Sequence, residues 1–282
     1  MIIIHSKTEL SHLLASYKNS GKTIGFVPTM GALHQGHLSL IEASVATCDI
    51  TVMSIFVNPT QFNDPKDFEK YPQNLEADIE KLNTTKCDIL FAPHAMEIYE
   101  NGLDERIQID LSVLNNVLEG EKRPGHYDGV VTVVYKLFQI VAPHKVFLGL
   151  KDYQQVLVIK ELIKQKALPI EAIGCPTLRE ANGLAMSSRN TRLNDEEKEI
   201  ALNLSKALRF IQSQKGKDTP EMIRKIAIKQ YLTQPLIRLE YLQISPENDI
   251  SVQIEDWNES QSYVVLIAAF VGNIRLIDNI VF

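Results

Sequence analysis

The sequence predicts an α/β protein with a parallel sheet that carries helices on both faces, followed by a smaller α+β domain. Two observations predict this fold. Over the first two-thirds of the chain, short apolar runs of strand length alternate with stretches of helical character, and strands separated by helices pair in parallel. Near residue 185 the alternation gives way to charged helices and then to strands joined by turns. We therefore expect a first domain at residues 1–180 and a second at residues 181–282.

The elements of the first domain follow from the apolar pattern. Runs such as ITVMSIFV, DILFA and KVFLG are continuous, apolar and of strand length, as in buried parallel strands. The segments between them have helical length and composition, although β-branched residues weaken the prediction for residues 129–141. In chain order we expect strands at residues 23–28, 50–57, 88–92, 145–149 and 170–174, and helices at residues 38–46, 75–82, 129–141 and 153–165.

The second domain is predicted to contain two helices and three strands. Residues 194–213 form a charged amphipathic helix for which Asn194 or Asp195 is a good N-cap. A second helix is expected at residues 220–232. Strands are expected at residues 236–244, in a short stretch around Gln253, and at residues 263–271.

Composition excludes several classes of protein. The chain has 282 residues, 45% of them hydrophobic, which is ample for a core. Its 29 basic and 35 acidic residues give a net charge of −6, which argues against a general nucleic-acid binder. Three cysteines, Cys48, Cys87 and Cys175, are too few and too widely spaced for a zinc site or a disulfide framework. The N-terminus does not read as a signal peptide, and the longest apolar run is too short for a membrane span, so we expect a cytosolic protein with no membrane partner.

The strongest local signal is PTMGALHQGH at residues 28–37, which follows a predicted strand and opens a predicted helix. A helix N-terminus offers unpaired N–H groups and a positive dipole, and Gly31 and Gly36 let the backbone approach a phosphate. His34 and His37 share a face at three-residue spacing, where they can stabilise charge on an α-phosphate. This layout resembles the HxGH nucleotidyltransferase superfamily. The alternative is a polar turn with two surface histidines.

A second segment, MSSRN at residues 186–190, lies at the predicted domain boundary. Its hydroxyls can donate to phosphate oxygens, and Arg189 can add charge-assisted bonds. Taken alone, a Ser-capped helix with a surface arginine explains the same residues.

A third segment, GLKDYQQ at residues 149–155, follows a predicted strand, where ligand sites of α/β proteins gather. Lys151 could neutralise phosphate, and Asp152 could cap a helix or hold ribose or magnesium. The plainer alternative is helix capping with a solvated lysine.

A fourth segment, FVNPTQF at residues 56–62, ends the second strand. Asn58 and Gln61 supply neutral donors and acceptors beside apolar residues, which suits a small hydroxy acid. Asn-Pro is also an ordinary turn signal.

Together these segments resemble the pantothenate synthetase family. The matching strings are PTMGALHQGHLSL, FVNPTQF, YPQNLEAD, LEGEKRPGHYDGVVTVV, KVFLGLKDYQQ and PTLREANGLAMSSRN, in the order and at the spacing of the family. The resemblance runs from about residue 20 to 195 and implies a Rossmann-like first domain and a C-terminal lid. It implies a ligase that activates pantoate with ATP as pantoyl adenylate and transfers the acyl group to β-alanine. Leu150 departs from the family, which usually has a polar residue there, and we expect this to tune activity rather than abolish it.

The resemblance also implies roles for individual residues. His37, His34, Lys151 and Arg189 would be catalytic, with His37 a hydrogen-bond donor to the phosphates. ATP would be bound by Met30, Gly31, Ala32, Leu33, His34, Gln35, Gly36, His37, Gly149, Leu150, Lys151, Asp152, Leu178, Met186, Ser187, Ser188 and Arg189. Pantoate would be bound by Gln61, Gln155, Asn58, Met30 and Phe56, and β-alanine by Gln61. Mg²⁺ would bridge phosphate oxygens with Asp78 nearby, and the protein would be a homodimer.

Two other classes of function compete with this interpretation. A nucleotidyltransferase that moves AMP or CMP onto a phosphate or alcohol would share the HxGH turn and the Ser/Arg segment but would not need FVNPTQF or KDYQQ. A non-catalytic nucleotide-binding protein would not need His34, His37, Lys151 and Arg189 together. A synthetase fragment acting on tRNA is disfavoured because the chain lacks a basic anticodon-binding region.

Overall fold

The computed structural model describes residues 1–62, 68, 69 and 71–282, and the chain divides into two compact units. The first unit comprises Met1–Gly149 and Gln154–Pro176. The second comprises Leu150–Tyr153 and Thr177–Phe282. The sequence placed the division at about residue 180. The short segment Leu150–Tyr153 was not expected in the second unit, and it contains the candidate phosphate-binding lysine.

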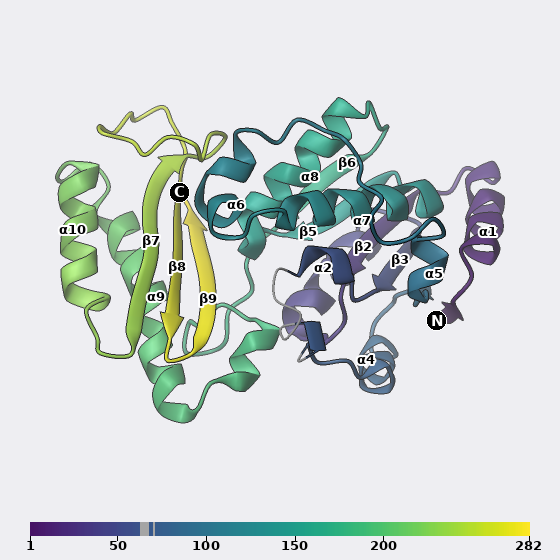
Figure 1. Ribbon diagram of the computed structural model, residues 1–282, viewed down its shortest axis with the longest axis horizontal. Helices are drawn as coiled ribbons and strands as arrows, with labels where there is room; N and C mark the ends of the chain where they lie inside the picture. The colour runs from purple at the N-terminus through teal and green to yellow at the C-terminus, as the bar shows by residue number, and fades with distance from the viewer. Residues whose placement is uncertain (63–67, 70) are drawn as a thin grey trace. The chain divides into compact units, whose positions relative to one another are not determined.

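The first unit is built on a six-stranded parallel sheet (Figure 1). Its strands are β1 (Ile2–Ile4), β2 (Ile24–Thr29), β3 (Ile50–Ile55), β4 (Ile89–Phe91), β5 (Lys145–Gly149) and β6 (Glu171–Cys175). They lie in the order β1-β4-β3-β2-β5-β6, and every pairing is parallel. The predicted parallel sheet is therefore confirmed.

The strand order reverses beside β2. From β2 the chain builds outward to β3 and β4, and then returns to place β5 on the other side of β2. Ligands of open parallel sheets bind at such a switch point, beyond the carboxyl ends of the strands. The turn after β2 and Gly149 at the end of β5 both lie at this edge of the sheet.

Helices cover both faces of this sheet, as predicted. The helices are α1 (Lys7–Asn19), α2 (Gln35–Val45), α4 (Leu75–Leu82), α5 (Ala95–Ile98), α6 (Leu118–Lys122), α7 (His126–Val141) and α8 (Tyr153–Gln165), with 3-10 helices η1 (Pro59–Gln61), η2 (Leu114–Asn116) and η3 (Leu150–Asp152). Val27 belongs to a buried cluster with Ile41 of α2. The adjacent Phe26 instead meets Phe138 of α7 edge to face, with ring centroids 6.4 Å apart. Because successive strand residues point to opposite faces, α2 and α7 lie on opposite sides.

The second unit pairs a three-stranded antiparallel sheet with two helices (Figure 1). Its elements are η4 (Ser188–Arg192), α9 (Asp195–Gln214), α10 (Pro220–Tyr231), β7 (Ile237–Pro246), β8 (Tyr263–Val271) and β9 (Ile274–Val281). One buried cluster joins both helices to all three strands. Asn194 caps α9 through a capping box with Glu197, as the sequence suggested. Strand β9 forms one edge of the sheet in the order β7-β8-β9.

Some elements differ from expectation. The strand expected around Gln253 is wrong, because residues 251–262 contain turns and bends but no strand. Strands β1 and β9 and helix α1 were not predicted. Helices α2 and α7 begin three residues earlier than expected, because His34 and Gly125 are their N-caps.

The cysteines, helices and acidic groups set limits on other classes of site. Cys87 and Cys175 are buried, Cys48 is partly exposed, and all three are free thiols. None of the helices within the described residues combines the length and apolar character needed to cross a membrane. Among those same residues, no group of three or more His, Cys, Asp or Glu side chains could hold a metal ion.

Candidate active site

The HxGH segment forms a sharp turn between β2 and α2. Gly31 has a φ of 82° and Ala32 a φ of 51°, so two consecutive residues adopt the left-handed region. A Cβ atom on Gly31 would lie 2.9 Å from Asp78 Oδ2 and 3.1 Å from Ile55 Cγ2. Glycine is therefore required at position 31 for conformation and for space.

Both imidazoles of the motif are held by backbone N–H groups. His34 caps α2, and its Nδ1 accepts the Gly36 N–H at 3.1 Å. Nδ1 of His37 accepts the His34 N–H at 3.2 Å, and the ring centroids are 4.1 Å apart. An Nδ1 atom that accepts a hydrogen bond cannot carry a proton, so each neutral ring carries its proton on Nε2. The turn thus specifies the tautomer of both histidines and makes each Nε2 a donor.

Two side chains of helix α4 form hydrogen bonds to the backbone of this turn. Asp78 is 2% exposed, and its Oδ2 and Oδ1 accept the N–H groups of Ala32 and Leu33, each at 2.8 Å. One helical turn later, Lys81 donates to the Leu33 carbonyl at 2.7 Å. The sequence suggested Asp78 as a neighbour of magnesium. Both of its oxygens are bonded to the backbone, so in this structure Asp78 supports the HxGH turn.

Asn58 and Gln61 form a buried polar cluster after β3. Asn58 is 1% exposed, and its Nδ2 donates to Gln61 Oε1 at 3.1 Å and to the Gly129 carbonyl at 3.3 Å. Its Oδ1 accepts from the Tyr99 hydroxyl at 2.7 Å and from Thr60. Burial raises the pKa of Tyr99, which keeps that hydroxyl protonated as a donor. With both ends of its amide engaged, Asn58 acts on Gln61 rather than as an open binding group.

Gln61 also contacts two further parts of the candidate site. Its Nε2 donates to Met30 Sδ at 2.8 Å, which joins the cluster to the HxGH turn. Its carbonyl lies 2.7 Å from Nδ1 of the buried His126, whose Nε2 is 2.9 Å from Arg123 NH1. Arginine can only donate, so His126 accepts at Nε2 and donates from Nδ1 to Gln61. Phe56, 7% exposed, packs near Tyr99 with ring centroids 6.3 Å apart.

A glycine in α7 makes this arrangement possible. A Cβ atom on Gly129 would lie 2.3 Å from the Thr60 carbonyl and 2.9 Å from Gln61 Cα. The 3-10 helix η1 therefore approaches α7 more closely than any residue with a side chain would permit. Nothing in the sequence around Gly129 indicated this contact.

The paired glutamines at the start of α8 have different environments. Gln154 is 2% exposed and bonds through its amide to Leu114, Val117 and Glu119, so it fixes the segment before α6. Gln155 is partly exposed, and its side chain makes no hydrogen bond to any described residue. Of the two, Gln155 has the more exposed side chain, and its binding of pantoate stays a prediction.

In the second unit, the Ser/Arg segment is fixed along β9. Ser187 caps η4 by accepting the Arg189 N–H at 3.2 Å. Upstream, Arg179 forms a bidentate ion pair with the buried Asp278 of β9, at 2.7 and 2.9 Å. Asn190, also buried, donates to Glu180 and to the Ala185 carbonyl. These bonds hold Ser187, Ser188 and Arg189 on a rigid support. Leu178, expected against adenine, is 40% exposed, and its carbonyl accepts the Met186 N–H.

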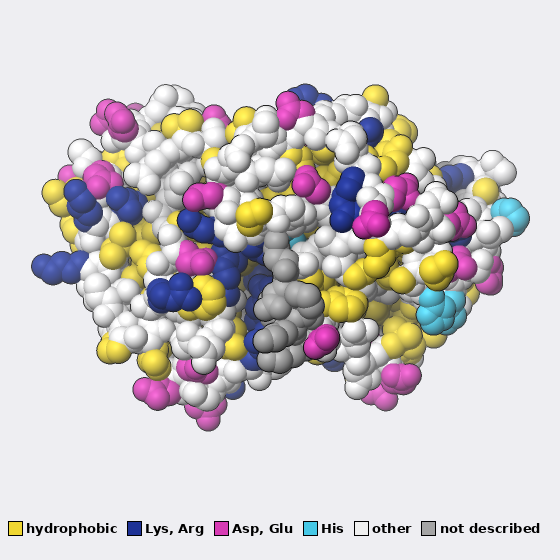
Figure 2. All heavy atoms as spheres, in the orientation of Figure 1, with side chains coloured by type: hydrophobic (Ala, Val, Ile, Leu, Met, Phe, Trp, Pro, Cys, Tyr) yellow, Lys and Arg dark blue, Asp and Glu magenta, His cyan; other side chains and the backbone are white. Residues whose placement is uncertain are grey.

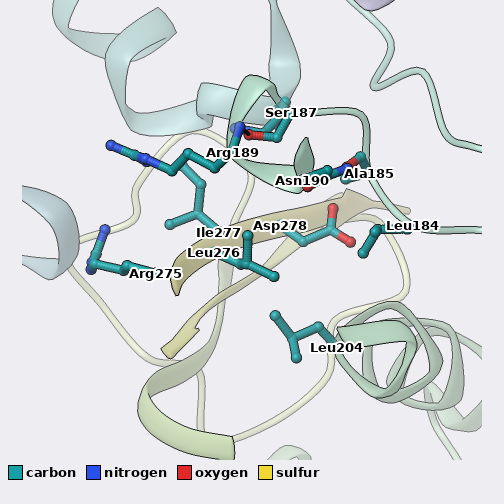
Figure 3. Close-up of a pocket in the computed structure, with 11 residues that line it drawn as sticks. Leu184, Ala185, Ser187, Arg189, Asn190, Leu204, Arg275, Leu276, Ile277 and Asp278 are labelled. Atoms are coloured by element: carbon teal, nitrogen blue, oxygen red, sulfur yellow. Dashed lines mark hydrogen bonds between the residues drawn. The ribbon is translucent and has the colours of Figure 1, made fainter. Parts of the chain in front are cut away.

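Cationic side chains line a pocket at this edge of the second unit. Figure 2 shows Lys and Arg side chains gathered over the second unit near strand β9. The basic residues that line this pocket are Lys151, Arg189 and Arg275, and Asp278 is its acidic residue. In Figure 3 the ends of Arg189 and Arg275 lie on the same side of the pocket, while the Asp278 carboxylate points away from them. Arg275 is already paired with Glu240 at 2.7 Å, so Lys151 and Arg189, beside the Ser187 hydroxyl, are the cations that suit a phosphate-bearing ligand.

The structure therefore joins the predicted residues in two groups. In the first unit, the HxGH turn, Met30, Asn58 and Gln61 are connected by direct contacts. In the second, Lys151, Ser187 and Arg189 line one pocket. Sequence reasoning missed the bracing role of Asp78, the contribution of Tyr99 and the glycine contact at Gly129. None of these three contacts is indicated by a local sequence motif.

Comparison with known proteins shows which family the chain belongs to. The sequence profile described as pantoate-beta-alanine ligase matches residues 2–281. The pantothenate synthetase of Porphyromonas gingivalis is 42% identical over 280 residues, which cover 99% of each chain, and that of Cytophaga hutchinsonii is 45% identical over 283 residues, covering 100% of this chain and 99% of the relative.

Solved structures agree in fold along the whole chain. The crystal structure of pantothenate synthetase from Thermus thermophilus has a TM-score of 0.89 and 36% identity, with 99% of each chain covered. Pantoate-beta-alanine ligase from Francisella tularensis, complexed with beta-gamma ATP and β-alanine, has a TM-score of 0.81 and 38% identity, with 99% of this chain and 97% of that one covered. Because profile, sequence and fold agree from one end of the chain to the other, the chain belongs to the pantoate–β-alanine ligase family of enzymes.

Proposed function

We propose that this enzyme condenses (R)-pantoate with β-alanine to give pantothenate, AMP and pyrophosphate through a pantoyl-adenylate intermediate. The observation that carries this proposal is the tautomer of the two motif histidines. Backbone N–H groups occupy both Nδ1 atoms at the N-terminus of α2, so both Nε2 atoms are donors. Two such donors at a helix N-terminus suit an α-phosphate that gains negative charge as pyrophosphate leaves.

In the first step, a carboxylate oxygen of pantoate attacks the α-phosphorus of ATP, and the bond to the bridging oxygen of pyrophosphate breaks. His34 and His37 donate to phosphate oxygens during this displacement. Gln61 and Gln155 hold pantoate, with Met30 and Phe56 as apolar walls. Asn58 and His126 act indirectly, because they bond to Gln61 and fix its position. The protein contributes alignment and charge stabilisation, with no covalent enzyme intermediate.

In the second step, the neutral amine of β-alanine attacks the acyl carbon, AMP leaves with the bonding electron pair, and the amine loses a proton. Gln61 is the candidate to contact β-alanine. The acyl adenylate is susceptible to water, so exclusion of solvent is part of the proposed mechanism. We assign this role to closure of the second unit, as the C-terminal lid that the family resemblance implies.

The second unit supplies the cations for the triphosphate. Lys151, Ser187, Ser188 and Arg189 bind phosphate oxygens in this proposal, which is supported by the pocket that Lys151, Ser187 and Arg189 line. Gly149, Asp152 and Leu178 contact the nucleoside. Mg²⁺ would come to the site with ATP and would stabilise negative charge on its phosphates. Asp78 would support the HxGH turn rather than the ion, because both of its oxygens accept backbone N–H groups. We further propose a cytosolic homodimer, which light scattering of the purified chain would test.

The function is tested by following AMP and pyrophosphate with ATP and pantoate, with and without β-alanine. We expect a small, adenylate-limited burst without β-alanine, detectable as pantoyl adenylate by mass spectrometry, and steady turnover when β-alanine is added. Steady AMP formation that ignores β-alanine would instead favour a nucleotidyltransferase. Nucleotide binding without AMP formation under either condition would favour the non-catalytic alternative.

A further inference from the structure

Strand β9 carries a buried asparagine whose amide bonds to the backbone around Lys151. Asn279 is 4% exposed, and its Nδ2 donates to the Leu150 carbonyl and to the Lys151 carbonyl, each at 2.8 Å. Both protons of one amide are therefore used on two consecutive carbonyls. All three residues lie within the second unit.

These two carbonyls determine the direction of the lysine. The Leu150 carbonyl lies in the rigid peptide plane before the Lys151 Cα, and the Lys151 carbonyl lies in the plane after it. An amide that holds both planes fixes the φ and ψ angles between them, and with these the direction in which the side chain leaves the backbone. The Leu150 side chain takes no part in these bonds, which explains how a leucine is compatible with the site at this position.

A second contact anchors the same segment. The Tyr153 hydroxyl donates to the Glu247 carbonyl at 2.6 Å, also within the second unit. Burial raises the pKa of Tyr153, so this hydroxyl remains a donor. The segment Leu150–Tyr153 follows β5 in the chain but is bonded to the sheet that supports Arg189. The Lys151 side chain, 18% exposed, accordingly lines the same pocket as Arg189 and Arg275.

We propose that Asn279 is a positioning residue for the reaction: it orients Lys151 toward the phosphates of ATP and keeps this lysine in register with Arg189. This inference rests on the proposed function, in which Lys151 binds the triphosphate. It assigns Asn279 no contact with substrate. Its effect should therefore appear in ATP binding and adenylation, should depend on the presence of Lys151, and should leave pantoate binding unchanged.

The test is a double-mutant cycle between Asn279→Ala and Lys151→Ala in the full chain. The readouts are kcat/KM for ATP and, separately, the affinities for α,β-methylene ATP and for pantoate by titration calorimetry. Asn279→Asp is a near-isosteric companion that replaces both donors with an oxygen facing two carbonyl oxygens. Val265→Ala is the matched control, because Val265 is a fully buried β8 residue whose truncation destabilises the same sheet through the cluster it shares with α9 and α10.

We expect Asn279→Ala to lower kcat/KM for ATP about 10- to 100-fold, the scale of a misplacement of about 1 Å. In the Lys151→Ala background the same change should alter kcat/KM less than about twofold, because the two residues act as a unit. Asn279→Asp should be at least as damaging. Val265→Ala, although less stable, should keep the wild-type kcat/KM for ATP.

Two results would overturn the inference: an equal loss in both backgrounds, or wild-type kinetics in a folded Asn279→Ala variant. If Asn279→Ala does not fold, Asn279→Ser carries the test by the same criteria, and Tyr153→Phe, which removes the other anchor, must show the same dependence on Lys151. Failure of the proposed function is distinguishable, because Lys151→Ala alone would then leave kcat/KM for ATP unchanged.

Discussion

The role of Asp78 is the sharpest point at which the structure departs from a plausible interpretation of the sequence, and one substitution distinguishes the two roles. Asp78→Asn preserves the shape of the side chain but replaces one carboxylate oxygen with an NH₂ group. Both oxygens accept backbone N–H groups at 2.8 Å, from Ala32 and Leu33. In the variant, the new NH₂ group therefore faces the backbone N–H of either Ala32 or Leu33, where two donors cannot form a hydrogen bond.

The magnitude follows from these two bonds. Losing one charge-assisted bond and leaving its buried N–H unpaired costs about 2 kcal/mol, and weakening the other from charged to neutral costs about 1 kcal/mol. We neglect the Lys81 ion pair, because its charged atoms are 3.9 Å apart and Lys81 is half exposed. We therefore expect the variant to lose about 3 kcal/mol of unfolding free energy. Because the turn shifts, kcat/KM for ATP should fall about 100-fold.

The assay is urea denaturation in EDTA, followed by the magnesium dependence of the rate. A brace acts without metal, so the loss of stability should be complete in EDTA, and the Mg²⁺ concentration for half-maximal rate should stay near that of the wild type. Glu76→Gln is the matched control, an exposed acidic residue in the same turn of α4, and should change stability by less than about 0.5 kcal/mol. An Asp78→Asn variant of unchanged stability that needs several-fold more Mg²⁺ would refute the bracing role and restore the metal-ligand role.

Three further predictions follow from local geometry. Gly31→Ala places a methyl group 2.9 Å from Asp78 at a positive φ, so it should lower the free energy of unfolding in urea by at least about 1–2 kcal/mol and lower turnover. Gly149→Ala is the control and should be nearly neutral in stability, because its Cβ would meet nothing within 4 Å. Equal losses in the two variants would contradict this account. Gly129→Ala should destabilise the protein and raise KM for pantoate, although alanine normally favours helices by about 1 kcal/mol, because its methyl group would meet the Thr60 carbonyl at 2.3 Å; a stabilised variant with unchanged KM would rule out the close contact. Burial raises the pKa of Cys87 from 9.0 to about 11, so the folded state holds this proton more tightly and unfolding free energy should fall as pH rises from about 9 to 11, by about 3 kcal/mol in total. Urea denaturation across this range should show that decline, and Cys87→Ala should flatten it; an identical decline in the variant would assign it to other groups.

The parallel sheet and its loops were predictable from sequence because buried parallel strands are continuous apolar runs and their helices are periodic. ITVMSIFV and KVFLG are continuous apolar runs of this kind. In a parallel sheet the segments that follow such strands lie at the same edge. The edge strand β1 was missed because its three residues are too short to show a pattern. Strand β9, with the sequence IRLIDNIV, was missed because its apolar residues do not alternate regularly and its DN pair resembles a turn signal.

Some residues of the candidate site were likewise predictable from the sequence and others were not. The groups proposed to touch ATP could be named because PTMGALHQGH, GLKDYQQ and MSSRN resemble segments of the family, although each segment alone also fits an ordinary turn or helix cap. The supporting residues could not, because their partners are distant in sequence. Asp78 lies 46 residues from Ala32, and Asn279 lies 128 residues from Lys151. Neither contact leaves a local trace, and only the fold brings the partners together.

The account depends most on the claim that the backbone fixes both motif imidazoles with Nδ1 unprotonated and Nε2 as the donor. Nitrogen-15 NMR of histidine-labelled protein, assigned with His34→Gln and His37→Gln variants, measures this directly. For both rings we predict an unprotonated Nδ1 and a protonated Nε2, with only the Nε2 signals moving when α,β-methylene ATP is added. A proton on Nδ1 of either ring, or Nε2 signals indifferent to the nucleotide, would contradict the account.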